Sequence, residues 1–304
     1  MATEISAAEF RKLRVALAQQ AYESNHVRLF DPDITACDCL VASRQGLFGV
    51  TRTSARLIAY GMYFGLAVHG NHIYLFEACD RPHSWTMKGR VIRLTRHGTE
   101  LVDAIPLITG LDNGCHHIKV IDNRLCIVDT HHQIILRYTL GGAFMNRVAP
   151  IPPARADDLT GCYVHMNSLA EMGDQIGIVL HNGALMPERN SELLVLDRQW
   201  HLVERHTLAG RGCHDILVRA DGSLLHCGSY AGELIGSRGE KVKLCDAMTR
   251  GLAATQDAIM IGITPYAARE ERGTLPGRVI YLDHALKPIA DIVLPGAPVD
   301  ILAL

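Results

Sequence analysis

Hydrophobic and polar positions follow two different patterns along the chain. From residue 4 to about residue 24, apolar residues recur at the spacing of one helix face, at Ile5, Phe10, Leu13, Leu17 and Tyr22. After Asp33, apolar runs of four to seven residues alternate with turns that contain Gly, Asn, Asp or charged residues, which is typical of strands. We therefore predict a helical extension at 1–33, packed on the outside, and an all-β domain at 34–304.

The strand-like runs form a repeating unit. A strand is followed by a short turn, such as HGN, IDN, MGD, ADG or TQD, and then by a second, more apolar strand. Two further strands complete each unit, and the period is about 36 to 52 residues. Five units begin near Phe64, His116, His165, His214 and Gly251. Four strands in a repeated unit are typical of a propeller blade.

The two ends of the chain complement each other. The C-terminal run PVDILAL reads as a first strand without a second, whereas CDCLVAS, LFGVTR and ARLIAYG near the N-terminus are three strands without a first. Joined, they supply a sixth blade and remove the exposed sheet edges of an open array. A sandwich or a single barrel would not predict a recurring turn inside a recurring unit. We predict a six-bladed β-propeller closed by its N- and C-terminal strands.

Composition narrows the functional class. The 304 residues are 48% hydrophobic and 20% charged, with a formal net charge of -2, so we expect no nucleic-acid partner. No apolar run is long enough to span a bilayer, and charges stand where a signal peptide would be apolar. The nine cysteines include no CxxC pair, which argues against zinc held by four cysteines. We predict a cytoplasmic protein that binds a small molecule and no membrane; the extension either caps the channel or mediates a dimer.

Histidine placement suggests a metal centre. Three of the sixteen histidines, His116, His165 and His214, each follow a Gly-Cys pair and are 49 residues apart. The first strand of each blade lines the central channel, so equivalent positions converge near the axis. Three imidazoles at one point suit zinc or iron, and copper less well, with a coordination position left for substrate. The alternative is that the histidines merely repeat with a duplicated blade.

Polar residues beside these histidines are candidates for the rest of an active site. Asp215 or Asp300 could orient an imidazole or act as a general base, and Arg44 could receive a carboxylate or phosphate. His131 and His132 could instead form a metal site with His116 or His117. The candidate catalytic residues are Asp215, Tyr230, Arg250 and Asp300. The candidate substrate-binding residues are Arg44, His117, His132, Asn167, His181 and Tyr266. Taken singly, each is also readily explained as a solvated channel or loop residue.

The runs CLVASRQGLFGVTRTSARLIAYG, HMNSLA and GCHDI, with the split closing blade, resemble the six-bladed propellers of the NHL-repeat and strictosidine-synthase-like group. Within that group, the lyase half of the peptide-amidating enzymes is similar in holding zinc with three histidines from different blades, which His116, His165 and His214 would match. The lactonases of the group use carboxylates and Asn around calcium, which only Asn167, Asp215 and Asp300 could imitate. The seven-bladed carotenoid oxygenases hold iron with four histidines.

Two functional classes follow. In the first, the chain is a metalloenzyme acting on a small polar molecule at the channel, by lyase, hydrolase or isomerase chemistry with zinc or as an oxygen-dependent oxidoreductase with iron. In the second, it is a non-catalytic propeller scaffold for a protein or small-molecule partner. The fold alone does not distinguish them. The convergence of the three histidines on one point would favour the enzyme.

Overall fold

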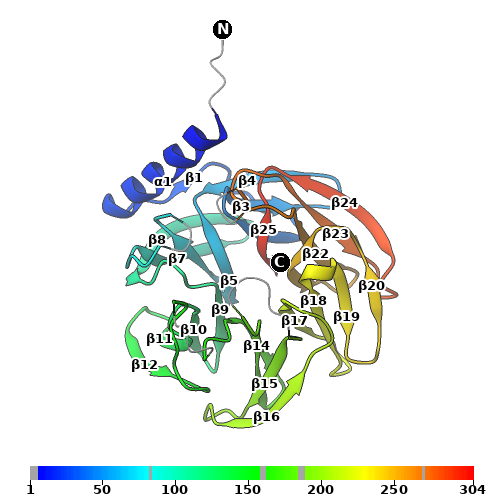
Figure 1. Cartoon of the computed structure of the whole chain (residues 1–304). Coiled ribbons are helices and arrows are strands. Elements are labelled where there is room, and N and C mark those ends of the chain that lie inside the picture. Colours follow the sequence, from blue (N-terminus) through cyan, green and yellow to red (C-terminus); the bar gives the residue numbers. More distant parts are fainter. Residues whose placement is uncertain (1–5, 82–83, 158–161, 184–188, 269–270) are drawn as a thin grey trace.

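The computed structural model describes residues 6–81, 84–157, 162–183, 189–268 and 271–304. Over these residues the chain forms six sheets around one axis, with the innermost strands in contact around a closed ring (Figure 1). The predicted all-β, six-bladed propeller is therefore confirmed.

Each blade is an antiparallel sheet whose strands follow one another from the axis outwards. The closing blade contains β25 (Pro298–Ala303), β2 (Cys39–Ser43), β3 (Gly46–Val50), β4 (Ala55–Tyr60) and the short β1 (Arg28–Leu29). The next two blades contain β5 (Tyr63–His69), β6 (His72–Ala78), β7 (Gly89–His97) and β8 (Glu100–Leu111), then β9 (His117–Ile121), β10 (Arg124–Asp129), β11 (Ile134–Thr139) and β12 (Phe144–Val148). As predicted, the two ends of the chain meet in one blade, because β25 pairs with β2.

The remaining three blades have the same plan. They contain β13 (Met166–Met172), β14 (Gln175–Leu180), β15 (Glu192–Leu196) and β16 (Leu202–Thr207), then β17 (His214–Val218), β18 (Leu224–Gly228), β19 (Glu233–Gly236) and β20 (Lys241–Lys243), and last β21 (Met248–Ala254), β22 (Ile259–Thr264), β23 (Gly277–Leu282) and β24 (Pro288–Leu294). A single 3-10 turn, Ser229–Ala231, follows β18.

The hydrophobic core lies between neighbouring blades rather than at the axis. One cluster, for example, joins Leu40 and Ile58 of the closing blade to Leu75 and Ile92 of the next. Middle strands such as β14 are buried almost throughout, whereas the outermost strand β16 is exposed along its whole length. Apolar packing between the faces of adjacent sheets therefore holds the ring together and leaves the axis to polar side chains.

Irregular pairing near the start of the innermost strands positions those polar side chains. The register shifts between β13 and β14 at Met166–Ser168 and between β17 and β18 at His214–Ile216. A bulge of this kind redirects a side chain and releases a backbone N–H from the ladder. Side chains of the preceding blade accept backbone amides of other innermost strands: the Leu66 amide of β5 donates to Asp300 Oδ2 at 2.7 Å and the Gly251 amide of β21 to Asp215 Oδ2 at 2.7 Å. The polar axial residues thus also connect one blade to the next.

The predicted N-terminal helix is α1 (Ala7–Glu23), which lies at the rim of the disc (Figure 1). Ser6 and Glu9 form a capping box at its start. Gln19 Nε2 donates to Asp80 Oδ1 at 3.0 Å, so the helix packs on a propeller loop. Among the described residues, no helix has the length and apolarity needed to cross a membrane. The division at residue 33 stays a prediction, although β1 lies before it and pairs with β4.

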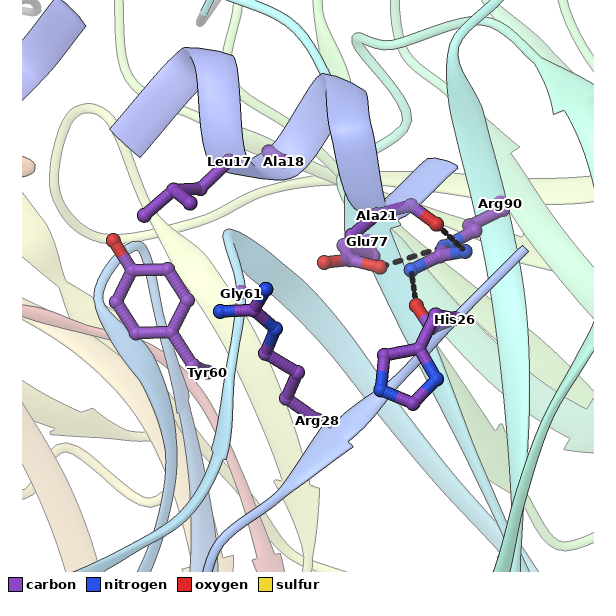
Figure 2. A pocket seen from close by; sticks show the side chains of 9 residues that line it. All are labelled: Leu17, Ala18, Ala21, His26, Arg28, Tyr60, Gly61, Glu77 and Arg90. Carbon is purple, nitrogen blue, oxygen red and sulfur yellow. Dashed lines mark hydrogen bonds and ion pairs between the residues drawn. The ribbon is translucent and has the colours of Figure 1, made fainter. Parts of the chain in front are cut away.

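A buried ion pair fastens the helix to the propeller (Figure 2). Arg90 Nε donates to Glu77 Oε2 at 2.7 Å, and both side chains are almost completely enclosed. The remaining guanidinium nitrogens of Arg90 donate to the carbonyls of Ala21, at 3.1 Å, and His26, at 2.8 Å. The positive charge is therefore matched by one carboxylate and two carbonyl oxygens, which explains how it tolerates burial.

Candidate active site at the propeller axis

Three polar side chains from alternate blades meet at the axis. His117 of β9, Asp215 of β17 and Asp300 of β25 each offer a ligand atom, and the three atoms lie within 4.8 Å of one another. Their exposed fractions are 9%, 7% and 5%, so they are enclosed but keep some contact with solvent. All three were candidate residues, and the tertiary structure brings them into one group, called here the axial group.

The repeat explains why only alternate blades contribute. On every innermost strand the axial position precedes Leu or Ile, and around the ring it holds Gly65, His117, Ser168, Asp215, Gly251 and Asp300. A Cβ atom at Gly65 would lie 2.9 Å from the Ile118 nitrogen, and one at Gly251 would lie 2.8 Å from Ile301 Cγ1. Small residues therefore alternate with long polar ones, because the axis has room for three such side chains.

The two carboxyl groups of the axial group disfavour each other's ionisation. Burial, followed by the charge of Asp215, raises the pKa of Asp300 to about 8. Burial likewise raises the pKa of Asp215 to about 6. Hydrogen bonds from backbone amides and the nearby charge of Lys119 oppose these shifts without cancelling them. Near neutral pH the pair therefore holds one proton and one negative charge.

The hydrogen bond of His117 fixes its tautomer. Its Nδ1 accepts the Leu169 amide at 3.2 Å, and burial lowers the pKa of the imidazole to about 3. The neutral ring therefore carries its proton on Nε2. Because an amide N–H cannot leave, that proton cannot move to Nδ1, and His117 is a poor metal ligand. The axial group is better suited to exchanging protons than to binding an ion.

A row of imidazoles lies beside the axial group. The ring centroids are 5.3 Å apart for His116 and His165, 4.9 Å for His165 and His181, and 5.2 Å for His181 and His214. His116 Nδ1 donates to the Gly114 carbonyl at 2.6 Å, and His214 Nδ1 donates to the Gly212 carbonyl at 2.8 Å. The neutral rings of His116 and His214 therefore carry their proton on Nδ1.

This row corrects the predicted centre of three histidines. His116, His165 and His214 do share one neighbourhood, but His181 stands between His165 and His214 in the row. Among the described residues, the groups whose ligand atoms lie within 4.8 Å combine aspartate with histidine, and none contains three histidines. The structure therefore supports Asp/His groups in place of the predicted metal centre.

The reason for the error is that equal spacing does not mean equal position. His116 and His214 immediately precede an axial residue, whereas the residue that precedes Ser168 is Asn167, and His165 lies two positions earlier. The left-handed backbone of His165, with φ 55°, carries the chain into the bulge. Hydrogen-bond register, rather than residue count, decides which side chains are equivalent.

Two arginines add positive charge to this end of the axis. Arg250, 9% exposed, acts electrostatically on His116, His214 and Asp215, and with burial it lowers the pKa of both histidines well below their usual range. Arg44 lies over the Phe64 ring, 5.3 Å from its centroid, and also disfavours protonation of His116. The imidazoles of His116 and His214 are therefore neutral at physiological pH, within a positive field.

The other predicted site residues divide between this cluster and the periphery. Tyr230 contacts His181, with ring centroids 5.4 Å apart. Tyr266 is half exposed and donates to the Tyr230 carbonyl. Asn167 is structural in its contacts, because its Nδ2 donates to the Cys213 carbonyl at 3.0 Å. His132 lies beside two aspartates, Asp112 and Asp129.

Sequence reasoning missed several residues. Lys119 follows His117 by two positions and acts on both axial carboxyl groups. Ser168 Oγ accepts the Asp215 amide at 3.0 Å. The signal that could have found them is the recurrent Leu or Ile after the axial position, which aligns the six innermost strands without reference to histidine.

Comparison with known proteins supports the architecture. No protein-family model matches the sequence, and no curated protein matches it. A chain in the crystal structure of a nidogen/laminin complex is similar with a TM-score of 0.62 and 12% identity, over 86% of this chain and 96% of that one. A protein of unknown function from Bacteroides caccae has a TM-score of 0.55 and 13% identity, over 86% and 97% of the two chains.

A third solved structure is a Bacteroides fragilis protein that has been suggested to be a 6-phosphogluconolactonase. Its TM-score is 0.53 at 10% identity, over 88% of this chain and 97% of that one. Likeness at such low identity shows the fold alone. The chain is thus a six-bladed β-propeller similar to these proteins, and the predicted NHL or strictosidine-synthase-like membership stays a prediction.

Proposed function

We propose that the chain is an enzyme that acts on a small polar molecule at the propeller axis by general acid–base catalysis. The observation that carries this proposal is the meeting of Asp215 and Asp300, both enclosed, within 4.8 Å in the axial group. Two carboxyl groups so close cannot both ionise at neutral pH, so one is an acid while the other is a base.

The two carboxyl groups have different roles in this proposal. Asp215, whose pKa of about 6 leaves it mainly ionised at neutral pH, accepts a proton from water or from the substrate. Asp300, with a pKa of about 8, donates a proton to the oxygen that leaves. After the reaction Asp215 carries a proton and Asp300 is ionised. The proton then passes from Asp215 to Asp300, directly or through solvent, which restores the starting state. Hydrolases, lyases and isomerases can all use such a pair of proton transfers.

The surroundings favour an anionic substrate. Arg44 and Arg250 supply positive charge close to His116 and His214, and a positive field attracts an anion. Hydrolysis of a sugar-acid lactone is the first reaction to test, because such a substrate combines an anionic group, hydroxyl groups and an acyl carbon open to attack by water. The fold shared with the Bacteroides fragilis protein is consistent with this choice.

The experiment measures hydrolysis of a panel of lactones and esters with and without carboxylate or phosphate groups. Asp215→Asn and Asp300→Asn preserve side-chain size and should each lose 10²- to 10⁴-fold in kcat/KM. Asparagine keeps one oxygen, which serves the Gly251 amide at position 215 and one of the two amides, of Leu66 and Ile301, that Asp300 accepts. Asp246→Asn, at a 98% exposed carboxylate, is the matched control and should match the wild type. The rate of the wild type should be bell-shaped in pH.

Full activity in either axial variant would exclude this mechanism. If no substrate on the panel is turned over, carbon-13 titration of the aspartate carboxyl groups still tests whether Asp215 and Asp300 share one proton. One carboxyl group should titrate with a pKa of about 8, and this titration should be absent in Asp300→Asn. A protein that neither turns over nor binds small anions would favour the scaffold alternative.

A further inference from the structure

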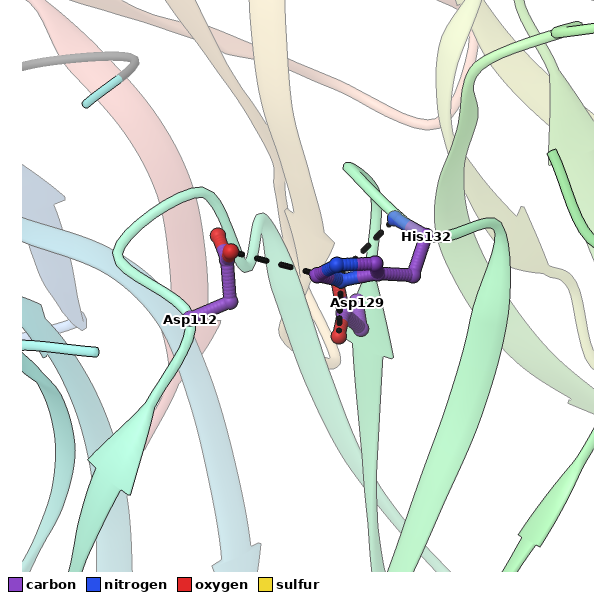
Figure 3. A group of neighbouring side chains, drawn as sticks. All are labelled: Asp112, Asp129 and His132. Carbon is purple, nitrogen blue, oxygen red and sulfur yellow. Dashed lines mark hydrogen bonds and ion pairs between the residues drawn. The ribbon is translucent and has the colours of Figure 1, made fainter. Parts of the chain in front are cut away.

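A second group of one histidine and two aspartates (Figure 3) lies at the ends of β8 and β10, neither of which is an innermost strand. Asp112 follows β8, and Asp129 and His132 stand at the end of β10. His132 Nδ1 is 2.9 Å from Asp129 Oδ2 and 4.0 Å from Asp112 Oδ2. Both carboxyl groups are buried, whereas the imidazole of His132 is 37% exposed. We call these three residues the off-axis group.

Local packing holds the off-axis group in place. Asp112 Oδ1 accepts the Gly114 amide at 2.6 Å and lies 2.7 Å from His131 Nδ1. A Cβ atom at Gly114 would lie 2.1 Å from His131 Cε1, so glycine is required for the imidazole to lie against the backbone. Trp85 covers the His131 ring on another side, with centroids 4.4 Å apart. Asp112 is thus fixed before any ligand binds.

The group opens into a surface cavity of about 560 Å³, lined by Asp129, His132, Ile134, Arg147, Ala149, Pro153, Ala154 and Arg155. This cavity is an observation independent of the ligand distances. It gives water and small ligands access to His132 and Asp129.

The tautomer of His132 permits metal binding. A carboxylate only accepts hydrogen bonds, so Nδ1 of His132 donates to Asp129 and shares its proton there. When an ion binds Nδ1, the proton of His132 has to leave that atom. It can move to Nε2 or to solvent, because the ring is 37% exposed and borders the cavity. Ligand atoms 2.9 to 4.0 Å apart can surround an ion with bonds of about 2.0 to 2.2 Å after small movements.

We propose that Asp112, Asp129 and His132 bind a divalent transition-metal ion whose open coordination positions face the cavity. One imidazole nitrogen and two carboxylates suit Zn²⁺, Mn²⁺, Fe²⁺ or Co²⁺ rather than Ca²⁺, which takes oxygen ligands. Three protein ligands leave positions for water or a small ligand. The two buried carboxylates would place their negative charge against the ion.

Trp85 provides the test, since its ring centroid lies 6.1 Å from that of His132. Tag-free full-length protein is titrated with Co²⁺, which quenches nearby tryptophan emission. Saturable quenching with one equivalent is expected. It should vanish in Trp85→Phe, and its midpoint should rise at least tenfold in Asp129→Asn and in His132→Gln. The other tryptophan, Trp200, is buried in the core and reports that each variant is folded.

Asp215→Asn separates this proposal from the axial one, because it changes the axial group alone and should leave the Co²⁺ midpoint unchanged. Quenching that persists unaltered in folded Asp129→Asn and His132→Gln, or that is lost in Asp215→Asn, would overturn the off-axis site. Absence of saturable quenching and of bound Co²⁺ after dialysis would overturn it equally.

Discussion

The axial and off-axis groups have the same composition, one histidine and two aspartates, yet their chemistry differs. At the axis, His117 Nδ1 accepts a backbone amide, which locks the ring proton on Nε2. Off the axis, His132 Nδ1 donates to Asp129, and its ring is partly open to solvent. The hydrogen bond made by each histidine, rather than the residue types nearby, therefore decides which ring nitrogen carries the proton and which could bind an ion.

The axial carboxyl groups also differ from the buried carboxylate of Glu77 in whether a cation compensates their charge. Asp215 and Asp300 face each other with one histidine that stays neutral, so one of them keeps its proton. Glu77, by contrast, is enclosed beside Arg90 and has a complete ion pair. A buried carboxylate with a matched cation serves folding, whereas an unmatched pair is available for chemistry.

The largest effect is expected from removing the buried ion pair of Glu77 and Arg90. Glu77→Ala leaves the Arg90 guanidinium buried without its carboxylate and should lower the free energy of unfolding by about 3 to 5 kcal/mol. Urea unfolding followed by circular dichroism measures it. Asp257→Ala breaks the exposed pair with Arg52 and should leave stability unchanged. Equal stability of Glu77→Ala and wild type would remove the contrast with the axis.

The alternation of small and long residues at the axis can be broken directly. Gly65→Ala places a Cβ atom 2.9 Å from the Ile118 nitrogen, next to His117, and should cost about 1 to 3 kcal/mol through overpacking. The matched control is Gly141→Ala, whose Cβ atom would meet nothing closer than 3.8 Å and should be neutral. Thermal unfolding of both variants is the measurement. A neutral Gly65→Ala would show that the axis has room to spare.

Stability should depend on pH through the axial pair. The pKa of Asp300, about 8 in the folded protein, lies above that of an unfolded chain, so the folded state holds the extra proton and loses stability as pH rises. Between pH 6.5 and 8 the loss should be at most about 2 kcal/mol, because one proton contributes about 1.4 kcal/mol per pH unit. Chemical unfolding of metal-free protein at several pH values measures the loss.

Asp300→Asn should flatten this alkaline fall, which is the decrease in the free energy of unfolding as pH rises from 6.5 to 8. Asp246→Asn should leave it unchanged. Below pH 6.5 the sign reverses for the buried histidines: the lowered pKa values of His116 and His214 mean that the unfolded chain takes up protons first, so the contribution of these two groups to stability falls with pH. A steep alkaline fall that survives Asp300→Asn would contradict the assignment.

The smallest expected effect concerns Lys119, whose charge lowers the pKa of both axial carboxyl groups. Lys119→Gln should move the midpoint of the alkaline fall upward by less than about one pH unit. Lys241→Gln, at an exposed strand position, is the control and should not move it. A midpoint pH that stays the same or moves downward in Lys119→Gln would show that the charge of Lys119 does not act on Asp215 and Asp300.

Much of the fold could be predicted from the chain. Alternating apolar runs with a repeated internal turn identified the blades, and the incomplete units at both ends identified the closing blade, because each blade is built from local antiparallel pairs. The helix was predicted from its spacing and is confirmed as Ala7–Glu23. These features depend on neighbours in sequence.

The site could be predicted only in part. Asp215, Asp300 and His117 were candidates because they lie at the start of innermost strands. His165 was misplaced because the bulge, set by hydrogen bonding, shifts equivalent positions away from equal spacing. Asp112 and Trp85 were missed, since nothing in the sequence places the end of β8 beside the end of β10.

The sequence alone therefore determined three features: the repeated four-stranded blade, the closing blade shared by the two ends of the chain, and the many polar residues at one end of the axis. The tertiary structure alone decided which of these residues touch, which imidazole nitrogen carries the proton and which carboxyl groups repel one another. The physical reason is that strand periodicity is local, whereas tautomers and pKa values depend on atoms a few ångströms away that belong to other blades.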